Sequence, residues 1–307
     1  MAISLPQDSD YKTAKIVLNN GIEMPALGMG TYRVRTEQEI FTLVDNGLKA
    51  GYRLFDTAAI YGNEAFLGQA LRTFLPKYNL EREDIFITSK LAINASAPAD
   101  HGTVAVPKAF NKSLNNLGLD YIDMYLIHFP GAARVHNQSP QNARLRTESW
   151  KAMIELYDDG KVNAIGVSNY TIAHLNDFEN NHLDLPVVNQ VEFHPFCNQA
   201  DLLRYCKSQY ICVQAYCSFG GLSVGSKDLI DHPVVKKLAK SYEATPAQVL
   251  LVWALQQEVP VIPKATSPQH IEENIKLDFR LNEDEMKCLT NLAPVTSRYA
   301  WDPTHVR

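Results

Sequence analysis

Four polar side chains in this chain could cooperate in proton-transfer chemistry. Asp56, Lys90 and His128 each end an apolar run, and Tyr61 follows the first of these runs by five residues. A tyrosine hydroxyl has a pKa of about 10, which a neighbouring ammonium group would lower, and a carboxylate would hold that ammonium in place. An imidazole within hydrogen-bonding reach could orient a carbonyl oxygen. Together the four groups would suit carbonyl reduction, with Tyr61 as the proton donor.

Each of these residues also has a simpler interpretation. Asp56 and Lys90 could form a structural ion pair in a protein core, and His128 could be a core histidine with satisfied hydrogen bonds. The catalytic interpretation therefore requires that all four side chains lie together, and the elements that carry them decide whether they do.

Short apolar runs alternate with longer amphipathic stretches along the chain. The runs are rich in Ile, Val and Phe and too short for buried helices, so we expect a parallel sheet covered by helices. The expected strands lie near residues 26–30, 53–56, 85–89, 122–128, 164–168, 187–191, 211–216 and 259–262. The expected helices lie near residues 36–50, 63–75, 103–118, 146–160, 171–181, 198–208, 245–257 and 268–276.

This repeated strand–helix unit predicts an α/β fold of one domain, a (β/α)8 barrel covering residues 1–307. A dinucleotide-binding Gly-x-Gly-x-x-Gly and a Walker-type loop are both missing. We further expect an N-terminal hairpin near 15–25, a mobile loop near 217–231 and an extra helix at 233–242. Because the C-terminal ends of barrel strands form one mouth, the four polar groups would meet there.

The composition is that of an ordinary globular protein, with 46% hydrophobic and 21% charged residues. A net charge of -5 without a basic cluster argues against a nucleic-acid or membrane partner. We see neither a signal peptide nor an apolar run of about 18 residues. The 5 cysteines form no Cys-x-x-Cys pair, which predicts free thiols in the cytoplasm. Metal-ligand spacing and a Gly-x-Ser-x-Gly elbow are also absent.

A series of motifs in order along the chain resembles the aldo-keto reductase family. The motifs are Leu27–Thr31, Phe55–Glu64, Ile87–Lys90, Leu117–His128, Gly166–Asn169, Asn189–Pro195 and Ile262–Pro268. The resemblance implies a (β/α)8 barrel and an enzyme that transfers a hydride from a nicotinamide cofactor to an aldehyde or ketone. It also implies a catalytic tetrad at Asp56, Tyr61, Lys90 and His128.

The resemblance further implies a cofactor site. The nicotinamide carboxamide is expected against Ser168, Asn169 and Gln190, whose hydroxyl and amide groups can satisfy it. Tyr216 is expected to stack on the ring, although it could instead be a core tyrosine. The other cofactor positions implied by the family are Gly30, Thr31, Ser218, Leu222, Lys264, Ser267, His270, Glu273 and Asn274.

Residues near the expected adenosine end favour NADPH. Ser267 and Pro268 are typical N-cap and first-turn residues of a helix whose N-terminus could face a phosphate. Lys264 could pair with the 2′-phosphate. The family commonly has arginine where His270 stands and serine where Ala265 stands. Because neutral histidine lacks a permanent charge, we expect weaker discrimination against NADH.

The substrate pocket is expected to be wide and aromatic. The family often places tryptophans at the mouth, whereas this chain has Tyr32, Ala92 and Phe129 there, with Ile60 beside the tetrad. Trp301, in a tail near 293–307, would fold over the mouth. We expect a small-molecule carbonyl substrate, no metal and a monomer. The alternatives are a cofactor-binding regulatory subunit with slow or no turnover, and a sugar-phosphate isomerase on the same barrel.

Overall fold

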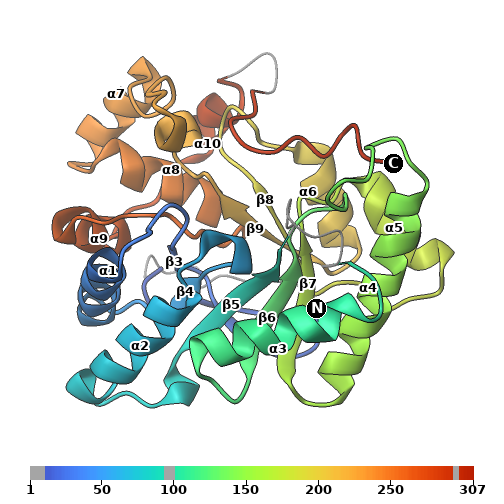
Figure 1. Ribbon diagram of the computed structural model, residues 1–307. Helices are drawn as coiled ribbons and strands as arrows, with labels where there is room; N and C mark the ends of the chain where they lie inside the picture. The colour runs from blue at the N-terminus through green and yellow to red at the C-terminus, as the bar shows by residue number, and fades with distance from the viewer. Residues whose placement is uncertain (1–10, 93–100, 293–296) are drawn as a thin grey trace.

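Parallel strands form the centre of the molecule, which a computed structural model describes for residues 11–92, 101–292 and 297–307. One sheet of seven neighbouring strands follows the order of the sequence. It consists of β3 (Met29–Gly30), β4 (Leu54–Asp56), β5 (Phe86–Leu91), β6 (Ile122–Ile127), β7 (Val162–Ser168), β8 (Val188–Glu192) and β9 (Cys212–Tyr216). Figure 1 shows these strands running side by side inside a layer of helices.

The segment around Val261 closes this sheet into a barrel. Val261 forms parallel bridges with Leu27 beside β3 and with Ala215 of β9. Its carbonyl accepts a hydrogen bond from the Gly28 backbone N–H, at 2.9 Å. The expected eighth strand is thus shortened to these bridges, because Pro260 and Pro263 on either side of Val261–Ile262 have no N–H to donate. The prediction of a (β/α)8 barrel is confirmed.

Helices surround the barrel as the alternating pattern predicted. They are α1 (Glu37–Ala50), α2 (Glu64–Phe74), α3 (Ala105–Leu117), α4 (Gln141–Asp158), α5 (Ile172–Asn180), α6 (Ala200–Ser208), α8 (Pro246–Leu255) and α9 (Pro268–Ile275). The expected extra helix is α7 (Pro233–Ser241). The prediction was wrong at the start of α4, whose polar first turn shows no apolar periodicity, and it missed α10 (Glu283–Thr290). A capping box between Asn282 and Glu285 begins α10.

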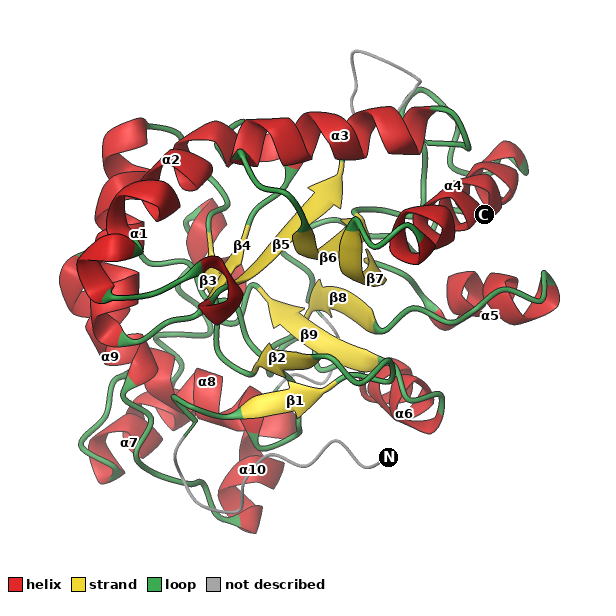
Figure 2. Ribbon diagram, turned by 90° about the horizontal axis from the view of Figure 1, so that it is seen from below, coloured by secondary structure: helices red, strands yellow, loops and turns green. Residues whose placement is uncertain are grey.

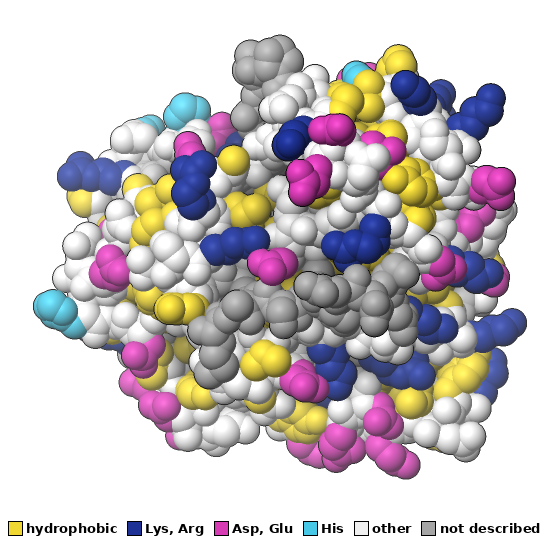
Figure 3. Space-filling view, turned by 180° about the vertical axis from the view of Figure 1, so that it is seen from behind, with side chains coloured by type: hydrophobic (Ala, Val, Ile, Leu, Met, Phe, Trp, Pro, Cys, Tyr) yellow, Lys and Arg dark blue, Asp and Glu magenta, His cyan; other side chains and the backbone are white. Residues whose placement is uncertain are grey.

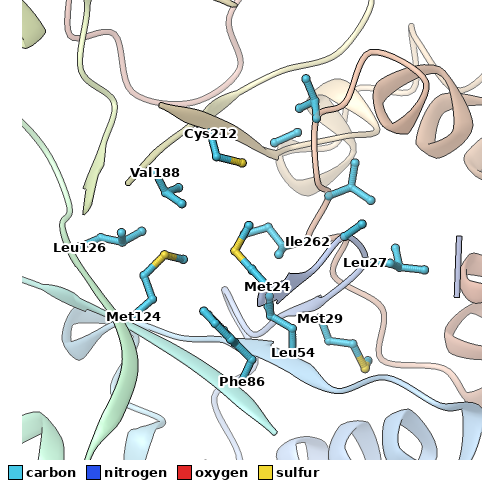
Figure 4. Close-up of a cluster of buried hydrophobic side chains, with 14 of the residues drawn as sticks. Met24, Leu27, Met29, Leu54, Phe86, Met124, Leu126, Val188, Cys212 and Ile262 are labelled. Atoms are coloured by element: carbon cyan, nitrogen blue, oxygen red, sulfur yellow. The ribbon is translucent and has the colours of Figure 1, made fainter. Parts of the chain in front are cut away.

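The predicted N-terminal hairpin covers the lower end of the barrel. Its strands are β1 (Lys15–Val17) and β2 (Glu23–Pro25), joined by a turn in which Gly21 has a φ of 86°. Seen from below in Figure 2, the hairpin lies across that end of the strands. Met24 of β2 is fully buried and points among side chains of the barrel interior, including Leu54 and Phe86 (Figure 4). This end of the barrel is therefore filled by apolar packing.

The outer surface carries charges of both signs. In Figure 3, basic and acidic side chains are interspersed on the face shown, with small apolar areas between them. Within the described ranges, no helix has the length and apolar character needed to cross a membrane.

Candidate active site

A buried ion pair lies at the upper end of the barrel, where β4 and β5 end. The Lys90 ammonium is fully buried and donates hydrogen bonds to Asp56 Oδ1, at 2.5 Å, and to the Thr57 carbonyl, at 2.8 Å. The second carboxylate oxygen of Asp56 accepts from Gln190 Nε2, at 2.8 Å. Asp56 therefore has partners at both oxygens, which is what a buried charge requires.

Tyr61 and His128 lie beside this ion pair. Tyr61 ends the short 3-10 helix η1 (Ala59–Tyr61) that follows β4, and its ring centroid is 5.3 Å from Lys90 Nζ. Its ring meets the His128 ring edge to face, with the centroids 5.7 Å apart. The structure thus brings together all four side chains that the sequence analysis selected.

The protonation of the phenol and the imidazole follows from their burial. Burial raises the pKa of Tyr61 well above its usual value, and the negative charge of Asp56 raises it further. A lowered Tyr61 pKa was expected from the sequence, but the net direction is upward, because burial and the Asp56 charge outweigh the effect of the Lys90 ammonium. Burial, together with the charge of Lys90, holds the pKa of His128 well below its usual range. The site therefore holds a protonated phenol beside a neutral imidazole at neutral pH.

Lys90 itself is subject to two opposing effects. Burial lowers the pKa of the ammonium, and the neighbouring Asp56 carboxylate raises it in return. The net direction is downward. The positive charge of Lys90 therefore depends on Asp56.

The side chains expected around the nicotinamide carboxamide form one hydrogen-bonded group. Ser168 Oγ donates to the Gln190 carbonyl, at 2.7 Å, and Asn169 Nδ2 donates to the His128 carbonyl, at 2.9 Å. The Tyr216 hydroxyl donates to Asn169 Oδ1, at 2.5 Å. Asn169 has a φ of 63°, a left-handed conformation that asparagine tolerates. These four residues border the tetrad, and their contacts with a nicotinamide stay a prediction.

Two links in this group were not foreseen from the sequence. Gln190 donates to Asp56 and also to Gln214 Oε1, at 2.8 Å each, so it joins the carboxamide positions to the ion pair. Asn63 accepts from Thr57 Oγ1, at 2.6 Å, and donates to the carbonyls of Thr31 and Val34. Both amides lie in the quoted motifs, but only the fold shows which groups they meet.

The positions expected near the phosphates gather around the start of α9. Ser267 caps this helix by accepting from the His270 backbone N–H, at 3.2 Å, which confirms the predicted helix start. The side chains of Lys264 and His270 are exposed there, and Asn274 is buried one turn further on. Gly30 lies opposite: a Cβ at this position would come within 2.9 Å of the Ile262 carbonyl oxygen. Only glycine permits this close approach.

The residues after β9 complete this side of the mouth. Leu222 lies in the 3-10 helix η4 (Gly220–Val224) and is 40% exposed. The Arg33 side chain contacts the Ser223 carbonyl and thereby joins the loop after β3 to η4. Ser218 is buried, and its hydroxyl has no hydrogen-bond partner among the described residues. An unpaired buried hydroxyl, an exposed lysine and a helix N-terminus together suit a phosphorylated ligand. The residues present thus fit a nicotinamide dinucleotide.

Aromatic side chains line the outer part of the mouth. Tyr32 lies 5.2 Å from Tyr61 between ring centroids, and Trp301 lies 4.9 Å from His128 and 5.7 Å from Phe129. Ile60 is 46% exposed beside them. Ala92, at the edge of the described residues, is half-buried. The predicted tail does reach the mouth: in Figure 1, residues 297–307 run over the upper end of the strands.

A barrel that combines this tetrad with a matching dinucleotide site belongs to the nicotinamide-dependent oxidoreductases. Residues 26–294 match the model of the Aldo/keto reductase family. The chain therefore belongs to the aldo-keto reductase family.

Known relatives cover nearly the whole chain. It is 41% identical over 280 residues to the uncharacterized oxidoreductase YtbE of Bacillus subtilis (strain 168), covering 91% of this chain and 92% of that protein. It is 39% identical over 272 residues to the glyoxal reductase of the same organism, covering 88% and 90%. It is 35% identical over 302 residues to the NAD(P)H-dependent D-xylose reductase I,II of Candida tropicalis, covering 90% and 91%.

A solved structure is similar over the same extent. The aldo-keto reductase MGS-M4 from a Medee basin deep-sea metagenome library superposes with a TM-score of 0.83 at 37% identity, covering 95% of this chain and 99% of that one.

Proposed function

We propose that the protein reduces small aldehydes and ketones to alcohols with NADPH, and that Tyr61 donates the proton. The observation that carries this proposal is the position of the Tyr61 ring, which meets the His128 ring edge to face and lies 5.3 Å from the buried Lys90 Nζ. When bound, the nicotinamide supplies a hydride to the carbonyl carbon, and this chemistry requires an acid for the oxygen.

The four side chains divide the remaining work. His128 orients the carbonyl oxygen through a hydrogen bond, and Tyr61 gives this oxygen its proton as negative charge develops there. The product is the alcohol, and the resulting tyrosinate regains a proton from solvent. Lys90 stabilises the tyrosinate through its positive charge. Asp56 and Gln190 keep Lys90 in place.

The cofactor would be held at two ends. Ser168, Asn169 and Gln190 supply the polar groups for the carboxamide, and Tyr216 supplies the stacking ring. At the other end, Lys264 and the N-terminus of α9 favour the 2′-phosphate of NADPH, while His270 gives less discrimination against NADH than arginine would. The related xylose reductase is named for use of either cofactor. Metal-free action as a cytoplasmic monomer also remains a prediction.

The test is NADPH oxidation with benzaldehyde by the wild-type protein and by Tyr61→Phe. We expect steady turnover by the wild type and a loss of about 10²–10⁴ in kcat for the variant, because only the acid is removed. The NADPH dissociation constant should stay unchanged. Tyr78→Phe is the matched control, since it removes a hydroxyl that bonds to Asp45 far from the mouth. Near-native kcat in Tyr61→Phe would contradict the assignment of the acid.

The same assay separates the proposed enzyme from its alternatives. Tight NADPH binding without turnover of any carbonyl would favour a regulatory subunit. Conversion of a substrate without nicotinamide dependence would favour an isomerase.

A further inference from the structure

A second buried carboxylate, separate from the tetrad, lies at the mouth. Glu192 is the last residue of β8, and its side chain is fully buried. Its Oε1 atom lies 2.9 Å from His194 Nε2 and accepts from the Tyr299 backbone N–H, at 2.7 Å. Its Oε2 atom accepts from the Ala300 backbone N–H, at 3.0 Å. Two of its three donors thus belong to the C-terminal tail.

This arrangement ties the carboxylate to the tail. A buried charge is expensive unless donors surround it, and backbone N–H groups satisfy it at fixed positions. Because an ionised carboxylate only accepts hydrogen bonds, both oxygens can serve the tail at once. A neutral amide of the same size could accept at only one of its two atoms.

A second group of contacts holds the far end of the tail. Arg146 of α4 is buried and donates to the Arg307 carbonyl, at 2.8 Å. His174 of α5 lies 2.8 Å from the Val306 carbonyl through its Nε2 atom. Val306 is itself buried. The segment between these anchors crosses the mouth, as Figure 1 shows.

Trp301 lies in this held segment, directly after the two residues that Glu192 binds. Its ring contacts His128 and Phe129, yet the side chain is still 39% exposed. Packing alone therefore holds it only in part, and the neighbouring backbone must set its position. The backbone hydrogen bonds at Tyr299 and Ala300 are the nearest such restraint.

We propose that Glu192 is a positioning residue that holds the Tyr299–Ala300 backbone and so fixes Trp301 as a wall of the substrate pocket. The inference rests on the proposed function, since it assigns a positioning residue to the same active site. It predicts that Glu192 affects only substrates large enough to reach Trp301, such as aromatic aldehydes. Cofactor binding should not depend on it.

Glu192→Gln tests the anchor directly, by hydrogen exchange of the tail amides. We expect the amide that loses its acceptor, that of Tyr299 or of Ala300, to exchange about tenfold faster or more, because a buried hydrogen bond to a charged group is lost. The KM for benzaldehyde should rise about threefold to tenfold, the effect of losing one aromatic contact. The KM for propanal and the Kd for NADPH should stay unchanged. Glu192→Asp, which keeps the charge but withdraws it by one methylene, should give a smaller effect in the same direction and serves if Glu192→Gln does not fold.

A double-mutant cycle with Trp301→Ala shows whether Glu192 acts through Trp301. In the Trp301→Ala background, Glu192→Gln should leave the KM for benzaldehyde unchanged. Asp123→Asn is the matched control: Asp123 is a buried strand carboxylate that accepts from the Ile87 backbone N–H, at 2.9 Å, near the start of β6. It should lower the Tm without changing the tail exchange or either KM.

Two results would overturn the proposal. One is unchanged exchange at Tyr299 and Ala300 in Glu192→Gln, and the other is an equal rise in KM with and without Trp301. Inactivity of the wild type toward every carbonyl would instead overturn the proposed function, and the exchange measurement would remain readable.

Discussion

The two ends of the barrel differ in what fills them. At the lower end, Met24 packs among apolar neighbours (Figure 4), and the buried Gln214 amide donates to its sulfur, at 3.6 Å. At the mouth, Asp56, Lys90, His128 and Glu192 are all buried and polar. Apolar packing stabilises the fold without requiring a specific partner for each group, whereas each buried charge at the mouth depends on one. The difference indicates that the lower end provides stability and the mouth gives up stability for chemistry.

Asp56→Asn should have the largest effect on the mouth, lowering both the stability of the protein and kcat. The change leaves the Lys90 ammonium buried without its counter-charge, which typically costs about 3–5 kcal/mol of unfolding free energy. Because the pKa of Lys90 is already lowered by burial, Lys90 should lose its proton more readily, and kcat should fall. Urea unfolding and the pH dependence of kcat measure these effects. Asp159→Asn, in an exposed ion pair with Lys161, should cost about 1 kcal/mol or less. An equal loss of unfolding free energy in both variants would show that the buried charge at the mouth is no more dependent on its partner than an exposed one.

Met24→Ala should damage the lower end while sparing the mouth. Removing this fully buried side chain should cost about 2–5 kcal/mol of unfolding free energy, through lost burial and a new cavity. Both kcat and KM at 25 °C should remain close to wild type. The measurements are urea unfolding and steady-state kinetics. Val17→Ala, on the exposed side of the same hairpin, should change stability by about 0.5 kcal/mol or less. A large fall in kcat for Met24→Ala would show that the two ends are not independent.

His270→Arg should have the smallest effect, an increase in the preference for NADPH over NADH at the cofactor end of the mouth. A guanidinium at this exposed position in the first turn of α9 would add a charge-assisted hydrogen bond to a 2′-phosphate. The ratio of kcat/KM for NADPH to that for NADH should rise about tenfold, the factor expected for one such bond. Gln269→Arg places the same charge one residue away and controls for general electrostatic attraction. An equal rise of this ratio in both variants would show that residue 270 does not bind the 2′-phosphate specifically.

Much of this arrangement was predictable because strand ends converge. The carboxyl ends of β4, β5 and β6 had to share one mouth once the barrel was recognised, so Asp56, Lys90 and His128 had to be close. The same logic placed Ser168 and Gln190. The Ser267–Pro268 pair likewise predicted the start of α9 from local capping chemistry alone.

Features that depend on distant partners were not predictable. Glu192 was not selected from the sequence, because the two tail N–H groups that bind it lie more than a hundred positions further along the chain. The direction of the Tyr61 pKa shift required the depth of burial and the pairing of Lys90. The shortening of the eighth strand came from the two prolines beside Val261–Ile262. Their effect could not be predicted because it depended on which N–H groups the neighbouring strands needed for hydrogen bonds.

The closure at Val261 has a consequence for how the molecule behaves among its own copies. An open parallel sheet would present unpaired N–H and carbonyl groups on its outermost strands, and such edges are templates for association with other chains. Here the short proline-flanked segment bonds to both sides: Val261 donates to the Ala26 carbonyl, at 2.9 Å, and Ile262 donates to the Ala215 carbonyl, at 3.2 Å. A few residues thus remove both edges of the sheet, and with them a route to aggregation.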